Sequence, residues 1–276
     1  MMKAACFCLL LWAHLLRAET AAEFLAKINA RLHTKALNLD SSTPVLLIPV
    51  AGHVQGAGGT FFRSDLMLVN HRSIDQEIAV VWLAQGVDNF DGPVKFVSLA
   101  PHTVYPYRDY VASELGQSGL GSIIISGVTD SGGIDDLAQL DGSSRIYTND
   151  PRGGGGTVSQ LLPGVPVKDV PAGSRSIAIG LRQDSAFRTN VGVVNPHNAT
   201  HTFTVRAASG YLGGPDNTFT ITVPPFSMRQ VAIPAGKYDD LFVEFTSDSP
   251  VWWSAYGATV DNVTGDSWCA HAALNF

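Results

Sequence analysis

The stretches "FFRSDLMLVN" at 61–70 and "AFRTNVGVVN" at 186–195 are two nearly matching phrases in one chain of 276 residues. When Phe62 is aligned with Phe187, the phrases lie 125 positions apart. The matched positions form a repeat motif of two parallel sets: Phe62, Arg63, Asp65 and Asn70, and Phe187, Arg188, Asn190 and Asn195. Further matches follow in the same order, such as "VSLAPHTVYPY" with "ITVPPFSMRQV" at a spacing of 124 positions. Similar segments in the same order and at a near-constant spacing predict an internal duplication.

Each copy has the sequence pattern of β-strands. Between residues 62 and 68, successive side chains alternate between the two faces of an extended strand. Short runs of β-branched and aromatic residues recur at intervals of about ten residues, separated by Gly, Pro, Asn and Asp. The pattern predicts an all-β fold of two tandem Ig-like β-sandwich domains, at 44–150 and 173–276. Helix is expected only from Ala21 to Leu32 and around Tyr110 to Leu115.

The connector between the copies spans residues 151–172 and is rich in glycine and proline. Gly153 to Gly156 form a flexible or sharply turning tract. Leu161 and Leu162 make the rest too apolar for a free linker. We therefore expect the connector to close the first sandwich or to pack between the two.

The first 18 residues have the layout of a secretory signal peptide, with Lys3, an apolar run and a small residue, Ala18, at a cleavage position. The segment 19–43 would then begin the exported chain, which we expect in the periplasm, on the cell surface or outside the cell. Loss of Lys3 and Arg17 would change the formal charge from −6 to −8, which leaves no electrostatic footprint for nucleic acid. No later apolar run is long enough for a transmembrane helix.

The Arg-x-Asp/Asn pair of the repeat motif has two interpretations. Residues two apart on a strand share a face, so Arg63 can contact Asp65 directly, or each can reach a neighbouring strand or loop. A shared binding site is one interpretation. A polar contact that anchors the strand is favoured, because copied domains most readily share what the fold needs. Asn70 and Asn195 are expected to bond the backbone of the turns that follow.

Three segments carry the resemblance of this chain to a known group: "GAGGTFFRSDLMLVNHRS", "RTNVGVVNPHN" and "AYGATVDNVTGD". They resemble uncharacterised exported bacterial proteins with tandem Ig-like β-sandwich repeats, over roughly residues 44 to 270. The resemblance implies an exported sandwich protein, and it implies no activity.

Residues for metal or nucleophilic chemistry are sparse. His197 and His201 flank an expected turn, where a spacing of four does not place both rings on one face. The loop from Asp130 to Asp141 is acidic but lacks the ordered spacing of a calcium loop, so a solvated loop is favoured over a calcium site. Cys269, the one cysteine after the signal, is expected as a buried thiol. The sequence predicts no catalytic residues, no metal and no cofactor.

Four aromatic residues are the candidate ligand-binding residues: Trp252, Trp253, Tyr105 and Tyr107. The adjacent tryptophans would point to opposite faces of one strand, so one would face outward. An exposed aromatic ring can stack on a sugar or anchor a protein partner. The first hypothesis is a non-enzymatic structural or interaction module of the cell envelope or exterior, with an unknown protein or glycan partner. The alternatives are a carbohydrate-binding module and an enzyme whose site is not visible in the sequence.

Overall fold

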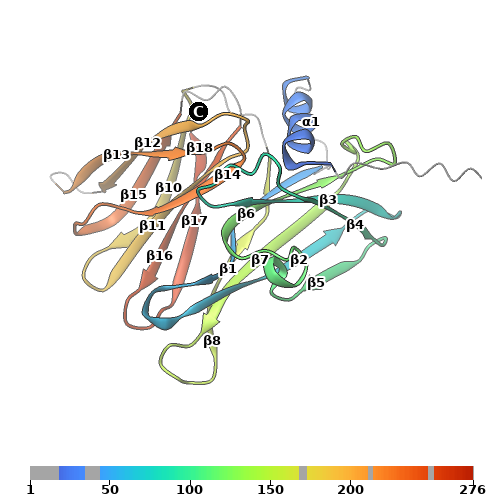
Figure 1. The fold of residues 1–276 in the computed structure, drawn as a ribbon. Coiled ribbons are helices and arrows are strands. Elements are labelled where there is room, and N and C mark those ends of the chain that lie inside the picture. Colours follow the sequence, from blue (N-terminus) through green and yellow to red (C-terminus); the bar gives the residue numbers. More distant parts are fainter. Residues whose placement is uncertain (1–18, 35–43, 168–172, 211–213, 248–251, 276) are drawn as a thin grey trace, which may run out of the picture.

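The computed structural model describes residues 19–34, 44–167, 173–210, 214–247 and 252–275. It confirms the predicted all-β sandwich fold (Figure 1). Both segments for which helix was expected are helical: α1 (Ala21–Thr34) and the short α2 (Tyr110–Ser113); a 3₁₀ turn, η1 (Ala57–Gly59), is the other helical element among these residues. The predicted signal peptide lies outside the described residues.

The first half of the chain forms two packed β-sheet layers, which we call sheet 1 and sheet 2. Sheet 1 has the order β5-β2-β7-β8, with β2 (Phe61–Asn70), β5 (Val104–Tyr107), β7 (Leu140–Asn149) and β8 (Thr157–Pro163). Sheet 2 has the order β4-β3-β6-β1-β9, with β1 (Val45–Gln55), β3 (Gln76–Ala84), β4 (Val94–Leu99), β6 (Gly119–Gly127) and β9 (Val165–Pro166). A bulge bends β1, and its C-terminal end pairs with β2, so that β1 joins the two sheets.

The second half repeats this strand order in sheet 3 and sheet 4. Sheet 3 has the order β14-β11-β16-β17, with β11 (Phe187–Asn195), β14 (Ser227–Ala232), β16 (Ser254–Asp261) and β17 (Ser267–His271). Sheet 4 has the order β13-β12-β15-β10-β18, with β10 (Arg175–Gln183), β12 (His201–Ser209), β13 (Asp216–Val223), β15 (Tyr238–Thr246) and β18 (Ala273–Asn275). Every strand of one half has a counterpart in the other. The descent of both halves from one copied unit stays a prediction of the sequence.

The connector supplies β8 and β9, which extend sheets 1 and 2 respectively. Leu162 and Val167 are buried and belong to a core cluster that reaches into the second half. The tract from Gly153 to Gly156 makes the turn between β7 and β8. The connector therefore closes the first sandwich, one of its two expected roles.

The turn between the second and third strands of each half shows what the repeat motif builds. The amide of Asn70 donates to the carbonyls of Ile74, Leu99 and Ala100, and its oxygen accepts from the backbone N–H of Arg72. Because this side chain is buried, the bonds replace water that the backbone groups would otherwise need.

Asn195 makes the same bonds in the second half. Its amide donates to the carbonyls of Ala199, Val223 and Pro224, and its oxygen accepts from the N–H of His197. The two asparagines thus tie together equivalent pairs of turns, and the prediction that they bond the local backbone is confirmed.

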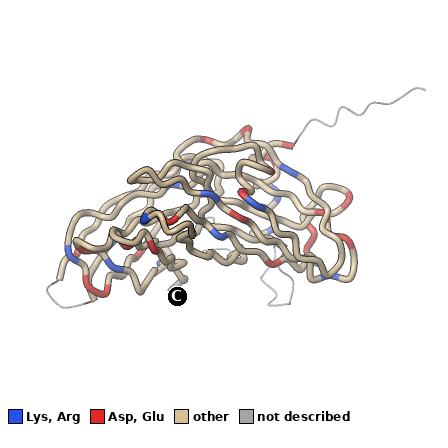
Figure 2. Tube along the Cα trace, turned by 90° about the horizontal axis from the view of Figure 1, so that it is seen from below, with Lys and Arg blue, Asp and Glu red and all other residues tan. Residues whose placement is uncertain are grey.

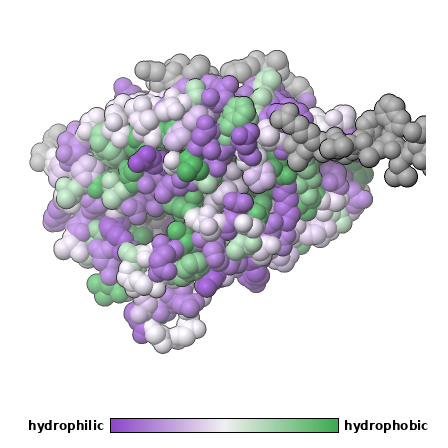
Figure 3. All heavy atoms as spheres, viewed as in Figure 1, coloured by the Kyte–Doolittle hydropathy of each residue, from purple (hydrophilic) through white to green (hydrophobic). Residues whose placement is uncertain are grey.

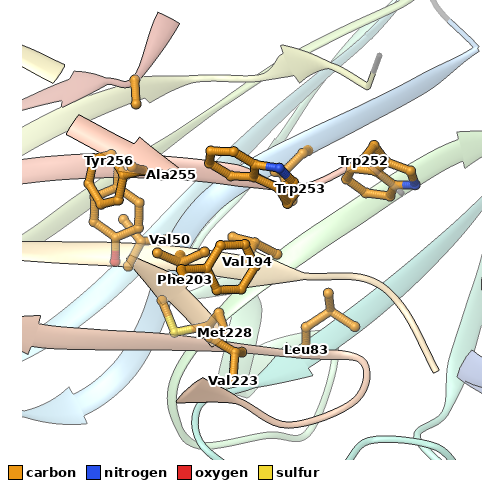
Figure 4. Close-up of a cluster of buried hydrophobic side chains, with 14 of the residues drawn as sticks. Val50, Leu83, Val194, Phe203, Val223, Met228, Trp252, Trp253, Ala255 and Tyr256 are labelled. Carbon is orange, nitrogen blue, oxygen red and sulfur yellow. The ribbon is translucent and has the colours of Figure 1, made fainter. Parts of the chain in front are cut away.

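The two sandwiches pack through the outer face of sheet 2 and the outer face of sheet 3 (Figure 1). Figure 4 shows Val50 and Leu83 of the first half beside Val194, Met228 and Tyr256 of the second. A Cβ atom at Gly192 would lie 2.3 Å from the ring of Tyr256, so only glycine allows that ring to lie flat on β11.

Helix α1 covers the remaining part of the outer face of sheet 2 (Figure 1). It begins with a reciprocal cap, in which Thr20 bonds the N–H of Glu23 and Glu23 bonds the N–H of Thr20. Phe24, Leu25 and Ile28 form its buried side. At 25 cal/mol per Å² of apolar surface, each such side chain contributes about 2 kcal/mol.

Candidate functional site

The structure corrects the prediction that one of the adjacent tryptophans faces outward. Trp252 and Trp253 are only 2% and 5% exposed. They lie just before β16, where the chain enters the junction of the two halves (Figure 4). Trp252 donates from Nε1 to Oδ1 of Asn29 in α1 at 2.8 Å, and Trp253 packs edge-on against Phe203, with ring centroids 5.4 Å apart. Both rings fill the core, because α1 covers the segment before β16 at Trp252 and sheet 4 covers it at Trp253. Neither ring therefore has an outward side.

Tyr105 and Tyr107 are half-buried on the inner side of β5. Their rings stack on each other with centroids 6.3 Å apart, and Tyr107 also meets Tyr110 edge-on. The hydroxyl of Tyr105 accepts the backbone N–H of Ala100. Burial, and then the charge of Glu114 and the neighbouring Tyr105, raise the pKa of Tyr107. These tyrosines close the edge of the first sandwich instead of offering a free ring face to a ligand.

A different cluster lies on the outer, solvent-facing side of sheet 1. Its members project outward from β2 and β7 or follow β5, and we call the set the arginine face: Phe61, Arg63, Asp65, Met67, Arg108, Arg145 and Tyr147. The strand register places Arg63 opposite Tyr147 and Asp65 opposite Arg145. Cross-strand neighbours in this arrangement are within reach of each other.

Asp65 is the anchor of the arginine face. Its Oδ2 accepts a hydrogen bond from Arg108 at 2.6 Å and lies 3.9 Å from a guanidinium nitrogen of Arg145. Its Oδ1 accepts the backbone N–H of Asp109 at 3.1 Å. Of the two contacts expected for the repeat motif, the one to neighbouring strands and loops is therefore present, and Arg63 is not the ion-pair partner of Asp65.

Asp109 holds the second carboxylate of this site in an unusual backbone conformation, with φ of 47°. It precedes α2 without capping it, because its carboxylate turns to His53: Nδ1 of His53 lies 2.9 Å from Oδ1. Arg63 lies 3.8 Å from the other carboxylate oxygen. The backbone strain at Asp109 is thus offset by contacts to both β1 and β2.

Two of the guanidinium groups rest on aromatic rings. Arg63 lies 4.9 Å from the ring centroid of Phe61, and Arg145 lies 4.7 Å from that of Tyr147. The hydroxyl of Thr157 also accepts a hydrogen bond from Arg145. Stacking and ion pairing restrict the rotamers of both arginines before any ligand arrives. Burial, and then the charges of Asp65 and Asp109, raise the pKa of the Tyr147 phenol.

Exposed apolar side chains lie within and beside the arginine face. Met67 of β2 is 47% exposed, Val104 of β5 is 54% exposed and Leu161 of β8 is 64% exposed. Leu161 lies opposite Arg145 in the register, and Val104 lies opposite Val69 on the same outer side as Met67. A surface that combines arginine, aromatic and apolar side chains has the composition of a protein interface.

In the second half, the face that corresponds to the arginine face is not open over the described residues. The outer side of sheet 3, which corresponds to the outer side of sheet 1, is covered by the first half. Asn190, the counterpart of Asp65, carries no charge. Arg188 donates to Oδ1 of Asn262 at 2.6 Å and remains at the exposed end of its strand.

The side chains that could in principle ligate a metal fall into separate small groups. His197 Nδ1 lies 3.0 Å from His201 Nε2, so the prediction that the turn would keep these rings apart is wrong. In the acidic loop, Asp135 and Asp136 pair with Arg72 and Arg31. Across the described residues, no three His, Cys, Asp or Glu side chains gather as a metal site would require.

The nucleophilic side chains are also accounted for. Burial raises the pKa of the Cys269 thiol to about 12, which leaves it protonated at neutral pH. Ser254 Oγ lies 2.9 Å from Nε2 of His271, whose pKa is lowered by burial. Within the described part of the chain, no hydrogen bond orients the other nitrogen of His271, so this pair lacks the third member of a nucleophilic triad.

Comparison with known proteins adds no assignment, because neither a protein-family model nor a curated protein sequence matches the chain. Neither helix in the described part of the chain is long and apolar enough to cross a bilayer.

Most of the arginine face was missed by the sequence reasoning. Arg63 and Asp65 were found because the repeat motif contains them, whereas Arg108, Arg145 and Tyr147 lie far away in the chain. The usable signal was the pairing of "FRSD" in β2 with "SRIY" in β7, which depends on the strand register.

Proposed function

We propose that this chain is an exported, non-enzymatic interaction module of the cell envelope or exterior, and that it binds its partner through the arginine face. The observation that carries the proposal is the gathering of three arginines at an open sheet face, two of them on aromatic rings. Exported tandem Ig-like repeats, as the sequence resemblance implies, are consistent with such a role. A buried core that spans both halves supports a rigid presentation of this face.

The export part of the proposal is tested by N-terminal sequencing. Expression of the full chain with a C-terminal tag in a bacterium with a periplasm should give mature protein that begins near Glu19. A variant with Leu9 and Leu10 changed to arginine should keep the full N-terminus and stay in the cytoplasm. Recovery of an uncleaved wild-type chain from the cytoplasm would contradict export.

The binding part is tested by cross-linking in the native envelope. The wild-type chain should recover one specific protein, and the double variant Arg108→Glu with Arg145→Glu should lose it. The matched control is Arg206→Glu, because Arg206 also pairs with an aspartate and lies 5.5 Å from the ring of Phe242, but on sheet 4. Equal recovery by the wild type and the double variant would overturn the assignment of this face.

A second candidate function is glycan binding at the end of sheet 3. Trp268 is 37% exposed and meets the ring of Phe187 edge-on. Arg182 lies over the ring of Phe187, 4.3 Å from its centroid. Arg182 also lines a hollow of about 470 Å³ together with Ser185 and Lys237. Sugars stack on exposed aromatic rings of this kind. Quenching of tryptophan fluorescence by a polysaccharide, lost in Trp268→Ala, would support this candidate; unchanged fluorescence with all major polysaccharides would end it.

A further inference from the structure

We infer that the partner of the arginine face is an extended protein segment that carries acidic and apolar side chains together on one side. The inference rests on the proposed function of this face as a binding surface. It adds the chemistry of the partner, which follows from the charge, the order and the apolar surroundings of the three arginines.

The charge of the site is opposite to that of the chain. Three guanidinium groups share two carboxylates, those of Asp65 and Asp109, so the cluster has an excess of one positive charge in a chain of formal charge −6. Figure 2 shows basic and acidic residues interspersed elsewhere along both halves, without a large face of one sign. A local excess of positive charge against a negative background steers an acidic group to this place.

The arginines have free hydrogen-bonding capacity toward solvent. Arg108 is 79% exposed, and its bond to Asp65 uses one of five N–H donors. Arg63 lies 3.8 Å from Asp109, beyond the length of a strong charge-assisted hydrogen bond. A carboxylate can therefore be bound by guanidinium edges that are already held in place, which lowers the entropic cost of binding.

The surroundings favour a protein over an acidic polysaccharide. The ring of Phe61 carries Arg63 on its face and meets the ring of His53 edge-on, and the ring of Tyr147 carries Arg145. A sugar would have to displace these two guanidinium groups to stack there. Met67, Val104 and Leu161 instead offer exposed apolar area beside the cations. On the face drawn in Figure 3, hydrophobic and hydrophilic residues likewise lie side by side. An extended segment that carries acidic and apolar side chains on the same side, at positions two apart, matches this mixture.

The test uses the purified exported chain and three defined probes. The first probe is a fluorescent twelve-residue peptide with Glu and Leu in turn at every second position and Ser between them, which places both kinds on one side of an extended chain. The second has Gln in place of Glu, and the third is polygalacturonate. Fluorescence anisotropy should show saturable binding of the Glu peptide, weakened by added salt. The double variant Arg108→Gln with Arg145→Gln should bind it about tenfold more weakly, and Arg206→Gln should bind it as the wild type does.

Three results would overturn the inference: equal binding of the Glu and Gln peptides, tighter binding of polygalacturonate than of the Glu peptide, or no saturable binding at millimolar Glu peptide. Light scattering of the chain alone is run alongside, and self-association that the double variant abolishes would assign the face to a second copy instead. If the envelope cross-link depends on the arginine face while the Glu peptide fails, the inference falls and the proposed function stands. If the envelope cross-link is also insensitive to the face, both fall.

Discussion

Sheets 2 and 4 have the same strand order, yet sheet 2 is buried on both faces and sheet 4 on only one. In β3, every residue from Ile78 to Leu83 is buried, because one side meets sheet 1 and the other meets α1 and the second half. In β12, Phe203 and Val205 are buried, whereas Thr202 and Thr204 are exposed. The same topology therefore gives a continuous apolar run in β3 and alternation of exposed and buried residues from Thr202 to Val205 in β12.

This difference shows what decides the sequence of a strand. The register fixes which side chains share a face, and the neighbour on that face fixes whether they are apolar or polar. The faces of sheets 1 and 3 differ in the opposite way: the outer side of sheet 3 lies in the junction, and the outer side of sheet 1 remains open. The arginine face is available because the first half packs through sheet 2.

The largest effect is expected where a charge is placed on the doubly buried sheet. Val81→Asp would put a carboxylate, without a partner, on the side of β3 that faces α1 and the second half. We expect a loss of about 4 kcal/mol or more in the free energy of unfolding, measured with urea. Thr204→Asp, on the open side of sheet 4, should change it by about 0.5 kcal/mol or less. Similar losses in both variants would show that the outer face of sheet 2 is not buried.

A smaller loss is expected at the paired asparagines, which the two halves use in the same way. Asn70→Ala and Asn195→Ala each remove a buried amide that satisfies several backbone carbonyls. Each should cost about 3 kcal/mol in urea unfolding, because those carbonyls would stay buried without donors. The control is Asn149→Ala, at the exposed end of β7. A loss in one half only would mean that the matching bonds do not have matching roles.

The sequence allowed much of the fold to be predicted and little of the site. Alternation and turn residues gave the strands, and the repeated Asn70 and Asn195 marked equivalent turns. The burial of Trp252 and Trp253 was missed, because it depends on the packing of one half on the other, and no local pattern reports that. Arg108 and Arg145 were missed for a related reason: only the pairing of β2 with β5 and β7 brings them to Asp65.

The pH dependence of the free energy of unfolding should come mainly from the second half of the chain. His197 and His201 occupy the positions held in the first half by Arg72 and Gln76, which share a hydrogen bond of 2.8 Å. Burial, and then the neighbouring His197, lower the pKa of His201 below its usual 6.5. The unfolded chain therefore binds the proton more readily, so this contribution is present above pH 6.5 and is lost as the pH falls through the lowered pKa.

The double variant His197→Arg with His201→Gln tests this assignment, because it copies the pair of the first half. Its free energy of unfolding should fall less than that of the wild type between pH 7 and pH 5. His271, whose pKa is also lowered by burial, stays in both proteins and accounts for the remaining slope. An unchanged slope in the double variant would place the pH dependence elsewhere.

The smallest effect is expected when the arginine face is made to resemble its counterpart. Asp65→Asn copies Asn190 and keeps an oxygen that can accept the N–H of Asp109, while it removes the ion pair with Arg108. Because the partner guanidinium of Arg108 is largely exposed, we expect a loss of about 1 kcal/mol or less in the free energy of unfolding, measured with urea.

In the same Asp65→Asn variant, the pKa of Tyr147 should fall toward its ordinary value, since the charge of Asp65 helps to raise it. Absorbance of the phenolate during an alkaline titration reports this shift, and Tyr147→Phe identifies the signal. A rise in the pKa of Tyr147, or no change in it, would show that Asp65 does not act on Tyr147 as the geometry of the face requires.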